Sequence, residues 1–252
     1  MIRSSILLAG ITSILATHAL AQDDESKRWK VSTELGVIST SGNTETTSVQ
    51  GKIDAKQHLT RWHNHYIFSA LFKEDQVTQD DGTKTTEKTA EKYFGSIKSA
   101  YQLENEHSNF FVFGSHAEDE FGSYNRYSTA AIGYGTRLFN GESVQLDAEI
   151  GPGYFRGERV LEDETVETET GMILRGAASL AWQISPSAEF KQTLSVESGD
   201  DNTRTVAESS LSTRINASMQ MKVGFNVAND SNVAPDKENT DTMTYVNLVY
   251  NF

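Results

Sequence analysis

Cysteine is absent from this 252-residue chain, so neither a disulfide framework nor a cysteine-based metal site can hold it together. A lipoprotein anchor is excluded as well, because it needs a thiol to carry the lipid. Basic residues are in the minority: 22 Lys and Arg stand against 35 Asp and Glu. The resulting net charge of −13 argues against nucleic-acid binding, which requires a basic footprint.

Long apolar runs are also missing. No segment beyond the first residues reaches the ~18 consecutive apolar residues of a spanning helix. The chain starts with Met1-Ile2-Arg3, continues with the apolar stretch Ile6–Ala16, and then presents small residues in Ala19-Leu20-Ala21. This order is typical of a secretory signal peptide. We therefore expect residues 1–21 to be removed and residues 22–252 to form one domain.

The pattern that is present is a period of two. In residues 143–150, Val144, Leu146 and Ile150 alternate with Gln145, Asp147 and Glu149. Such alternation predicts strands with one apolar and one polar face, and it does not supply the three- and four-residue spacing of a helix. The same pattern recurs to the C-terminus. It predicts about twelve strands, near 28–38, 47–58, 63–74, 91–102, 109–118, 125–138, 143–155, 170–183, 187–198, 204–216, 219–229 and 241–252.

Connections between these segments alternate in length. Short connections follow the even-numbered strands, whereas long polar ones, such as 75–90, 156–169 and 230–240, follow the odd-numbered strands. Outer-membrane barrels show this asymmetry, with short periplasmic turns and longer outer loops. The fold class we expect is all-β: a closed antiparallel up-and-down transmembrane β-barrel. Aromatic residues near strand ends indicate two interfacial girdles, although strand propensity alone would also place them there: Trp29, Trp62, Tyr66, Tyr93, Tyr101, Tyr154, Trp182, Tyr250 and Phe252.

Two segments do not fit this scheme cleanly. Pro152 lies inside the seventh expected strand, where proline cannot donate to a ladder, so either the strand ends near Ile150 or a bulge lies there. Near 109–118 the phase is open, because Phe110 and Val112 compete with Phe111 and Phe113 for the outer face.

The last strand carries the most specific signal. Val246, Leu248, Tyr250 and the terminal Phe252 form one apolar stripe at every second position. The stripe resembles the C-terminal signature recognised by the outer-membrane barrel assembly machinery, which would capture an unpaired strand edge by strand addition. The expected localisation is the cell outer membrane of a Gram-negative bacterium, with its lipids and lipopolysaccharide as partners.

The segment Ser41-Gly42-Asn43-Thr44-Glu45-Thr46, together with the whole pattern after residue 21, resembles the YdiY-like family of salt-induced outer membrane proteins of unknown function. The resemblance implies a barrel of about twelve strands with no assigned activity, and it supplies no catalytic residues. Gly42-Asn43 is also an ordinary tight-turn dipeptide.

Charged residues on the polar faces should point into the barrel, since each would cost ~2–4 kcal/mol against lipid at the midplane. The candidate lumen-facing charges are Lys52, Asp54, Lys56, Arg137, Asp147, Glu149, Arg175, Glu189, Lys191, Arg214 and Lys222. They could line a narrow water path or pair across the lumen and seal it. Their mixed signs favour a paired, mostly closed interior.

Metal, cofactor and catalytic signals are weak. His63 and His65 share a strand face and lie near His58, but no carboxylate-rich partner accompanies them, so we predict neither metal site nor cofactor. The acidic loops, such as residues 158–169, could meet divalent cations at the surface or simply be solvated. Ser115 and His116 are neighbours that point to opposite faces, and no Gly-x-Ser-x-Gly elbow occurs.

These features predict a structural membrane protein and not an enzyme, and the family resemblance implies a role in adapting the envelope to salt or osmotic stress. A small diffusion pore, a lipid-modifying enzyme and a soluble periplasmic barrel are the alternatives.

Overall fold

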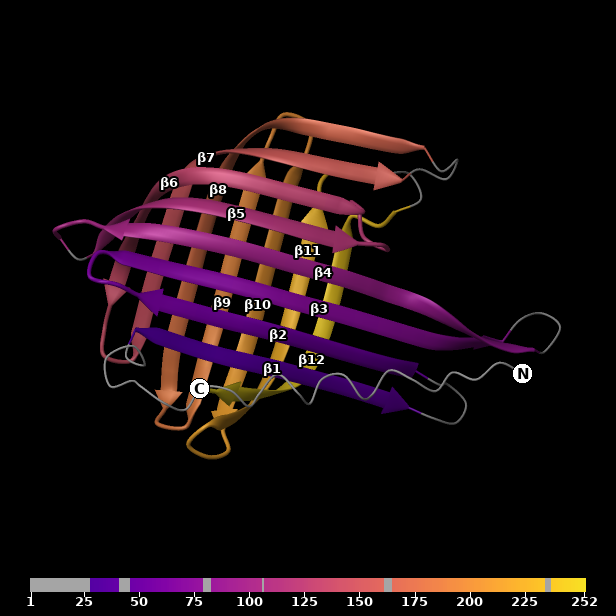
Figure 1. The fold of residues 1–252 in the computed structure, drawn as a ribbon, viewed down its shortest axis with the longest axis horizontal. Coiled ribbons are helices and arrows are strands. Elements are labelled where there is room, and N and C mark those ends of the chain that lie inside the picture. The colour runs from indigo at the N-terminus through magenta and orange to yellow at the C-terminus, as the bar shows by residue number, and fades with distance from the viewer. Residues whose placement is uncertain (1–27, 41–45, 79–82, 106, 161–164, 234–236) are drawn as a thin grey trace, which may run out of the picture.

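A computed structural model describes residues 28–40, 46–78, 83–105, 107–160, 165–233 and 237–252. Its strands are β1 (Trp29–Thr40), β2 (Thr46–His58), β3 (Trp62–Thr78), β4 (Lys84–Gln102), β5 (Ser108–Asp119), β6 (Arg126–Asn140), β7 (Val144–Val160), β8 (Val166–Ser185), β9 (Ala188–Ser198), β10 (Thr203–Arg214), β11 (Met219–Asp230) and β12 (Thr240–Asn251). Each strand pairs antiparallel with its sequence neighbours, and β12 pairs with β1 to close a barrel of twelve strands (Figure 1). Among the described residues, no helix is long and apolar enough to cross a membrane.

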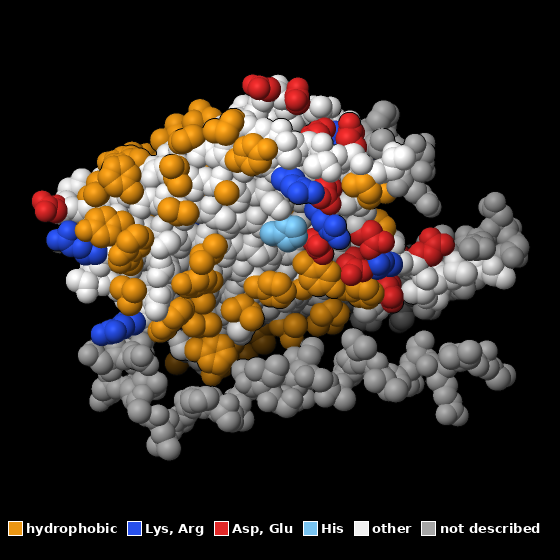
Figure 2. All heavy atoms as spheres, turned by 45° about the horizontal axis from the view of Figure 1, so that its top comes forward, with side chains coloured by type: hydrophobic (Ala, Val, Ile, Leu, Met, Phe, Trp, Pro, Cys, Tyr) orange, Lys and Arg blue, Asp and Glu red, His pale blue; other side chains and the backbone are white. Residues whose placement is uncertain are grey.

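The period of two in the sequence becomes the two faces of the wall. Side chains such as Leu174, Val246 and Ile132 point outward and are exposed, whereas their strand neighbours Arg175, Asn247 and Ala131 are buried inside. Exposed large apolar residues therefore cover the outside, as the hydrophobic surface in Figure 2 shows. A wall of this kind is inside-out relative to a soluble barrel, in which the apolar residues fill the interior.

The two ends of the barrel differ in the connections they carry. The loop end carries the connections 41–45, 79–83, 120–125, 161–165, 199–202 and 231–239. The turn end carries 59–61, 103–107, 141–143, 186–187 and 215–218, together with the start of β1 and the end of β12. Both described chain ends meet there, since the Phe252 backbone N–H donates to the Val31 carbonyl at 2.9 Å.

The predicted long loops at 75–90 and 156–169 are wrong in extent. β3 and β4 continue as a paired hairpin to Thr78 and Lys84, and β7 and β8 continue to Val160 and Val166. Backbone pairing persists in these segments although the apolar alternation ends. The sequence pattern reports only where one face is apolar, so it could not detect these polar extensions.

Pro152 neither ends its strand nor forms a bulge. The register between β7 and β8 runs unbroken from Val144 to Val160, and Pro152 pairs with Leu174. Toward β6 the paired residues stop at Ile150 and resume at Gly153 with the same register. The missing proline N–H therefore leaves a short gap in the pairing of β7 with β6, whereas the pairing of β7 with β8 is unbroken.

The structure shows which residues of β5 face outward, a point that the sequence left undecided. Phe110 and Val112 are exposed on the outside, whereas Phe111 is buried and Phe113 lies under the guanidinium of Arg175. The inward aromatic residues fill space inside the barrel beside Gly133, where an added Cβ would meet the Phe111 ring at 2.7 Å.

The seam between β1 and β12 is the shortest ladder of the barrel. It pairs Ser32–Leu35 with Leu248–Asn251, whereas every other neighbouring pair of strands is joined over eleven or more residue pairs. The stripe of Val246, Leu248, Tyr250 and Phe252 is exposed on the outer face of β12 at this seam. Closure of the barrel therefore depends on few backbone bonds, and side chains inside the seam reinforce it.

Aromatic residues ring the outside of the turn end. Trp29 stacks on Tyr66 with ring centroids 6.0 Å apart, and Trp62 meets Tyr101 edge to face at 5.3 Å. Tyr250 contacts Phe252 at 4.7 Å, and Trp182 is exposed on the same end. Tyr93 and Tyr154 lie on the outer face toward the loop end. The residues at the turn end lie where one girdle was expected, and two interfacial girdles remain a prediction.

Candidate functional site in the barrel lumen

All of the candidate lumen charges occupy the inward rows of their strands, opposite the exposed apolar side chains. This set comprises Lys52, Asp54, Lys56, Arg137, Asp147, Glu149, Arg175, Glu189, Lys191, Arg214 and Lys222. Most of them have an oppositely charged neighbour inside the barrel, and the pairs form three groups at different places in the lumen.

The first group crosses the middle of the lumen around Arg175. The Arg175 guanidinium lies 3.4 Å from Glu197 and 3.6 Å from Glu149, and its Cζ is 4.0 Å from the centre of the Phe113 ring. Lys98 of β4 pairs with Glu149 of β7, although β5 and β6 lie between these strands in the wall. The Arg175 side chain is only 9% exposed, so its charge is balanced by carboxylates and not by bulk water.

Glu197 also receives hydroxyl donors from a strand that is not its neighbour. Tyr127 and Thr129 of β6 each donate to its carboxylate at 3.0 Å, although β7 and β8 lie between β6 and β9 in the wall. Bonds to an ionised acceptor are stronger than neutral ones and fix the donor groups in place. The residues around Arg175 and Glu197 thus cross-link strands that are not neighbours in the wall.

The second group lies inside the seam. Lys222 of β11 is 3.2 Å from Glu34 of β1 and 3.0 Å from Glu208 of β10. Asn247 of β12 donates to Glu34 at 2.9 Å and is only 1% exposed. Tyr245, also on β12, donates to Glu208 of β10. Because these contacts join four strands around the short β1–β12 ladder, they fasten the barrel from within.

The third group lies toward the turn end and is more open to solvent. Asp54 pairs with His65 at 2.9 Å, and Arg137 with Asp147 at 2.8 Å. Glu189 pairs with Lys191 at 2.6 Å. Exposed pairs of this kind contribute little to stability, typically ~0–1 kcal/mol.

The three histidines considered as metal ligands, His58, His63 and His65, do not share one site. His58 and His63 face each other with ring centroids 5.0 Å apart, while His65 is engaged by Asp54. Within the part of the chain that the structure describes, no group of three or more His, Asp or Glu side chains is arranged to hold a metal ion.

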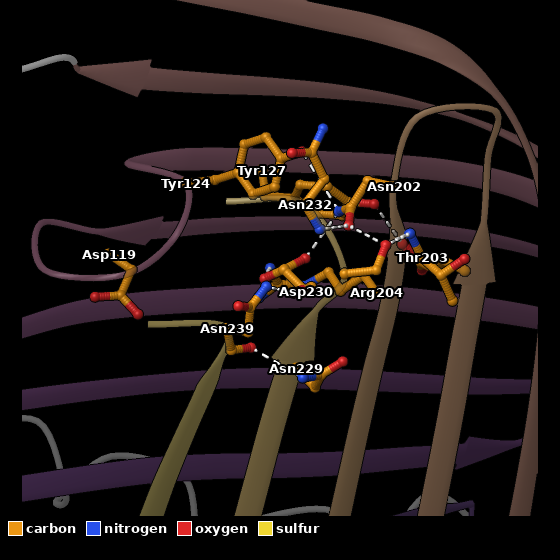
Figure 3. Close-up of polar contacts among 12 residues, drawn as sticks. Asp119, Tyr124, Tyr127, Asn202, Thr203, Arg204, Asn229, Asp230, Asn232 and Asn239 are labelled. Carbon is orange, nitrogen blue, oxygen red and sulfur yellow. Dashed lines mark hydrogen bonds and ion pairs between the residues drawn. The ribbon is translucent and has the colours of Figure 1, made fainter. Parts of the chain in front are cut away.

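A cluster of polar side chains lies at the loop end of the lumen, and sequence reasoning did not identify it (Figure 3). We call it the mouth cluster; it consists of Tyr124, Arg159, Glu169, Asn202, Arg204 and Asp230. Tyr124 comes from the connection between β5 and β6, Asn202 comes from the connection between β9 and β10, and Asp230 ends β11. The cluster therefore joins loop-end segments from opposite sides of the barrel.

Its contacts are short and numerous. Tyr124 donates to Glu169 at 2.7 Å and accepts a hydrogen bond from Arg159, which itself lies 3.0 Å from Glu169. Asp230 accepts from Asn202 at 2.9 Å and from Arg204 at 2.6 Å (Figure 3). Burial and the Glu169 carboxylate raise the pKa of Tyr124 above its ordinary value, so its hydroxyl remains a donor at physiological pH.

An apolar layer lies directly beneath the mouth cluster. Tyr127, Phe155 and Ile173 form this buried layer together with the ring of Tyr124, and the Tyr127 and Phe155 rings are stacked 5.6 Å apart. Gly157 accommodates Tyr124, since a Cβ there would lie 2.5 Å from the Tyr124 ring. The connection 120–125 thus places an aromatic plug in the mouth. The connection holds two aromatic residues, and the sequence does not show that Tyr124 is buried whereas Phe121 is exposed.

The acidic residues at 158–169, in the expected loop 156–169, have different surroundings. Glu169 belongs to the mouth cluster, whereas Glu158 lies on the outer wall beside Arg126 and Arg156. Residues 162–164 and the Asp80-Asp81 pair fall outside the described residues. Asp200 and Asp201 are exposed in the short connection between β9 and β10.

Comparison with known proteins places this geometry in context. Residues 33–252 match the family described as "Protein of unknown function, DUF481". The chain is 28% identical over 216 residues to the "Uncharacterized protein YdiY" of Escherichia coli (strain K12), covering 85% of this chain and 80% of that protein.

Two solved structures have similar barrels. The COG4313 outer membrane channel from Pseudomonas putida F1 matches with a TM-score of 0.50 and 10% identity, covering 93% of this chain and 100% of that one. The translocator domain of the autotransporter NalP from Neisseria meningitidis matches with a TM-score of 0.49 and 11% identity, covering 91% and 90%. Such low identities concern the fold alone. The family match extends over most of the sequence, and the chain therefore belongs to the DUF481 family of proteins of unknown function, to which the YdiY-like resemblance pointed.

Proposed function

We propose that this protein is an integral outer-membrane barrel with a closed lumen, serving a structural role in adapting the envelope to salt or osmotic stress. The loop end faces outward and the turn end faces the periplasm. The proposal has three parts, namely the membrane, the closed lumen and the stress role, and each rests on different support.

Support for the membrane comes from the outer wall. Large apolar side chains such as Phe68, Leu174 and Val223 are exposed around the barrel, and a soluble protein would expose no such continuous surface. Lipids and lipopolysaccharide are the partners that this wall fits. The exposed stripe on β12 suits capture by the barrel assembly machinery, because only four residue pairs join β12 to β1 among the described residues.

The observation that carries the closed lumen is the network of Lys98, Glu149, Arg175, Glu197 and Tyr127, which joins β4 to β9 through the interior. Above it the mouth cluster and the plug formed by Tyr124 occupy the loop end. A barrel of twelve strands is wide enough to hold water, but here the inward side chains are paired with each other.

The experiment is single-channel recording of the refolded protein in planar bilayers. We expect the wild type to be silent and the Tyr124→Ala/Arg159→Ala variant, which removes the plug, to show more frequent openings. A matched control, Tyr154→Ala/Arg156→Ala, changes the same residue types on the outer wall and should remain silent. Steady conductance by the wild type would refute the closed lumen.

A small diffusion pore is the second candidate. The half-exposed charges at the turn end, Arg137, Asp147 and Lys191, favour it because they would line a hydrated entrance. If the plug moves, this entrance would continue through the barrel. Conductance that appears only under voltage or osmotic stress would support a gated pore over a permanently closed barrel.

The stress role rests on the family resemblance and has its own test. Deletion should slow growth in high salt, and the wild-type gene should restore it. Sucrose-gradient fractionation of the same cells tests the membrane placement, since a soluble periplasmic protein would miss the outer-membrane fraction. The exposed acidic residues Asp200 and Asp201 could bind divalent cations at the surface, and calcium titration of the purified barrel would measure it.

A further inference from the structure

The outer wall of the barrel brings together a serine, a histidine and a carboxylate that no role in the lumen explains. His116 on β5 and Ser128 on β6 are register partners on the outward face, and His116 Nδ1 lies 2.8 Å from Ser128 Oγ. On the other side of the same ring, His116 Nε2 lies 3.5 Å from the Glu118 carboxylate. From these contacts we propose that Ser128, His116 and Glu118 form a hydrolytic site for acyl esters of phosphate-bearing membrane lipids.

The arrangement has the connectivity that serine nucleophiles need. A serine hydroxyl is activated when a neighbouring base accepts its proton and a third group orients the base. Glu118 favours the tautomer with the proton on Nε2, which leaves Nδ1 free to accept the Ser128 proton. Arg126 lies 3.2 Å from Glu118 and pairs with that carboxylate.

Sequence reasoning missed this group because it considered only the neighbour Ser115. Adjacent strand residues point to opposite faces, so Ser115 lies inside while His116 lies outside. Ser128 comes to His116 through the antiparallel register of β5 and β6, which links positions twelve residues apart. Only the register, and not the spacing, reveals the contact.

Basic side chains next to Ser128 suit a lipid with an anionic headgroup. Arg156 on β7 is the register partner of Ser128, and its exposed guanidinium bonds Glu158 at 2.8 Å through one nitrogen. Glu158 is the one partner of Arg156 among the described residues, so its remaining N–H groups can bind a phosphate or the oxyanion of an ester intermediate. Figure 2 shows acidic and basic side chains gathered toward the loop end of this wall, next to the hydrophobic surface.

Directly below the charged row the wall becomes small and apolar. Gly114 and Ala130 lie two residues from His116 and Ser128 along their strands, on the same face. Ile97 and Tyr154, both exposed, are their register partners on either side. A Cβ added at Gly95, beside His116, would meet nothing within 4 Å. An acyl chain could therefore lie against this part of the wall with its ester at the height of Ser128.

His116 and Ser128 lie at the depth in the membrane where lipid esters are found. Charged side chains on the lipid face are tolerated near the interface but not at the midplane. The row of His116 and Ser128 is the first polar row above an apolar one, so it belongs at the boundary where lipid esters meet headgroups. This step depends on the membrane placement proposed above, but not on whether the lumen is closed.

The reaction needs only water as co-reactant. Ser128 Oγ attacks the ester carbonyl carbon while its proton passes to His116 Nδ1. The ester C–O bond then breaks, and the departing glycerol oxygen takes that proton, which releases a lysolipid. Water attacks the acyl-serine in turn, gives its proton to His116, and the fatty acid leaves as Ser128 recovers its hydrogen.

The experiment uses the full refolded chain in mixed micelles of detergent with phosphatidylethanolamine and phosphatidylglycerol. Fatty acid and lysolipid are measured by mass spectrometry, and a fluorophosphonate probe is mapped by peptide analysis. We expect labelling at Ser128, and a loss of turnover of about a thousandfold or more in Ser128→Ala and His116→Asn. Ser115→Ala, the inward neighbour, is the matched control and should retain full turnover.

The outcomes separate this proposal from the others. Turnover or labelling that persists in Ser128→Ala would overturn it, as would the absence of both in wild-type protein that shows the heat-modifiable mobility of a folded barrel. Hydrolysis of purified lipopolysaccharide but not of phospholipid would support the site and assign its lipid. Because the protein is already folded in micelles, failure here leaves the fractionation and conductance tests of the proposed function unaffected.

Discussion

Replacing Arg175 with methionine should destabilise the barrel sharply, because it leaves buried carboxylates without their cation. Methionine keeps much of the volume and can still lie on the Phe113 ring. Glu149 retains Lys98, but Glu197 loses its only cationic partner among the described residues and keeps just two hydroxyl donors. The substitution therefore isolates the effect of one missing charge.

The expected magnitude follows from the burial of the pair. Removing one member of a buried ion pair costs about 3–5 kcal/mol, and loss of the cation over an aromatic ring adds about 0.5–2 kcal/mol. The hydroxyl donors and residual solvent in the lumen reduce this cost. We expect the free energy of unfolding of Arg175→Met to fall by about 3 kcal/mol, more than a hundredfold in the unfolding equilibrium.

A second substitution makes the reasoning testable. In Arg175→Met/Glu197→Gln the remaining carboxylate becomes a neutral amide that can still accept from Tyr127 and Thr129. Stability should recover to within about 1 kcal/mol of the wild type, since a buried pair replaced on both sides is often nearly neutral. The free energy of unfolding of each variant is measured by urea unfolding in liposomes, monitored by heat-modifiable mobility on a gel. Equal stability of Arg175→Met and wild type, or no recovery in the double variant, would refute the argument.

Three further substitutions probe the seam, the mouth and the C-terminus. Gly36→Val should lower unfolding stability by about 1–3 kcal/mol in urea, because its Cβ would overlap a buried side chain of β12, whereas Gly51→Val meets nothing within 4 Å and should be neutral. Tyr124→Phe removes the hydroxyl bonded to Glu169 and should cost about 1–2 kcal/mol by the same assay; a neutral result would mean that the plug is held by packing alone. Phe252→Ala should reduce the amount of folded protein in cell membranes but leave the stability of purified protein almost unchanged, since the ring is 63% exposed; equal cellular amounts would argue against its role as an assembly signal.

The sequence predicted the wall of this barrel better than its contents. Period-two patterning located the strands because each apolar residue of the wall must face outward, as Val144 and Ile150 do relative to Asp147 and Glu149. The same rule placed Arg175 and Lys222 inside. Patterning failed where both faces are polar, so the extended hairpins ending at Val160 and Thr78 were taken for loops.

Side-chain contacts between distant strands could not be predicted from the sequence, for a physical reason. Whether Arg175 meets Glu197 or Tyr127 meets Glu197 depends on register and on strand tilt, which no local pattern encodes. The same is true of His116 and Ser128 on the outer wall. The mouth cluster combines connections far apart in the chain, so only the closed fold brings Tyr124 to Glu169.

The central claim is that alternate side chains of one strand face lipid and the barrel interior. The absence of cysteine allows a clean test with single-cysteine variants along β9: Leu194→Cys, Ser195→Cys and Val196→Cys, each carrying a small fluorophore in liposomes. Brominated lipids should quench positions 194 and 196 strongly and position 195 little. Uniform quenching along the strand, or none because the protein stays in solution, would contradict the account.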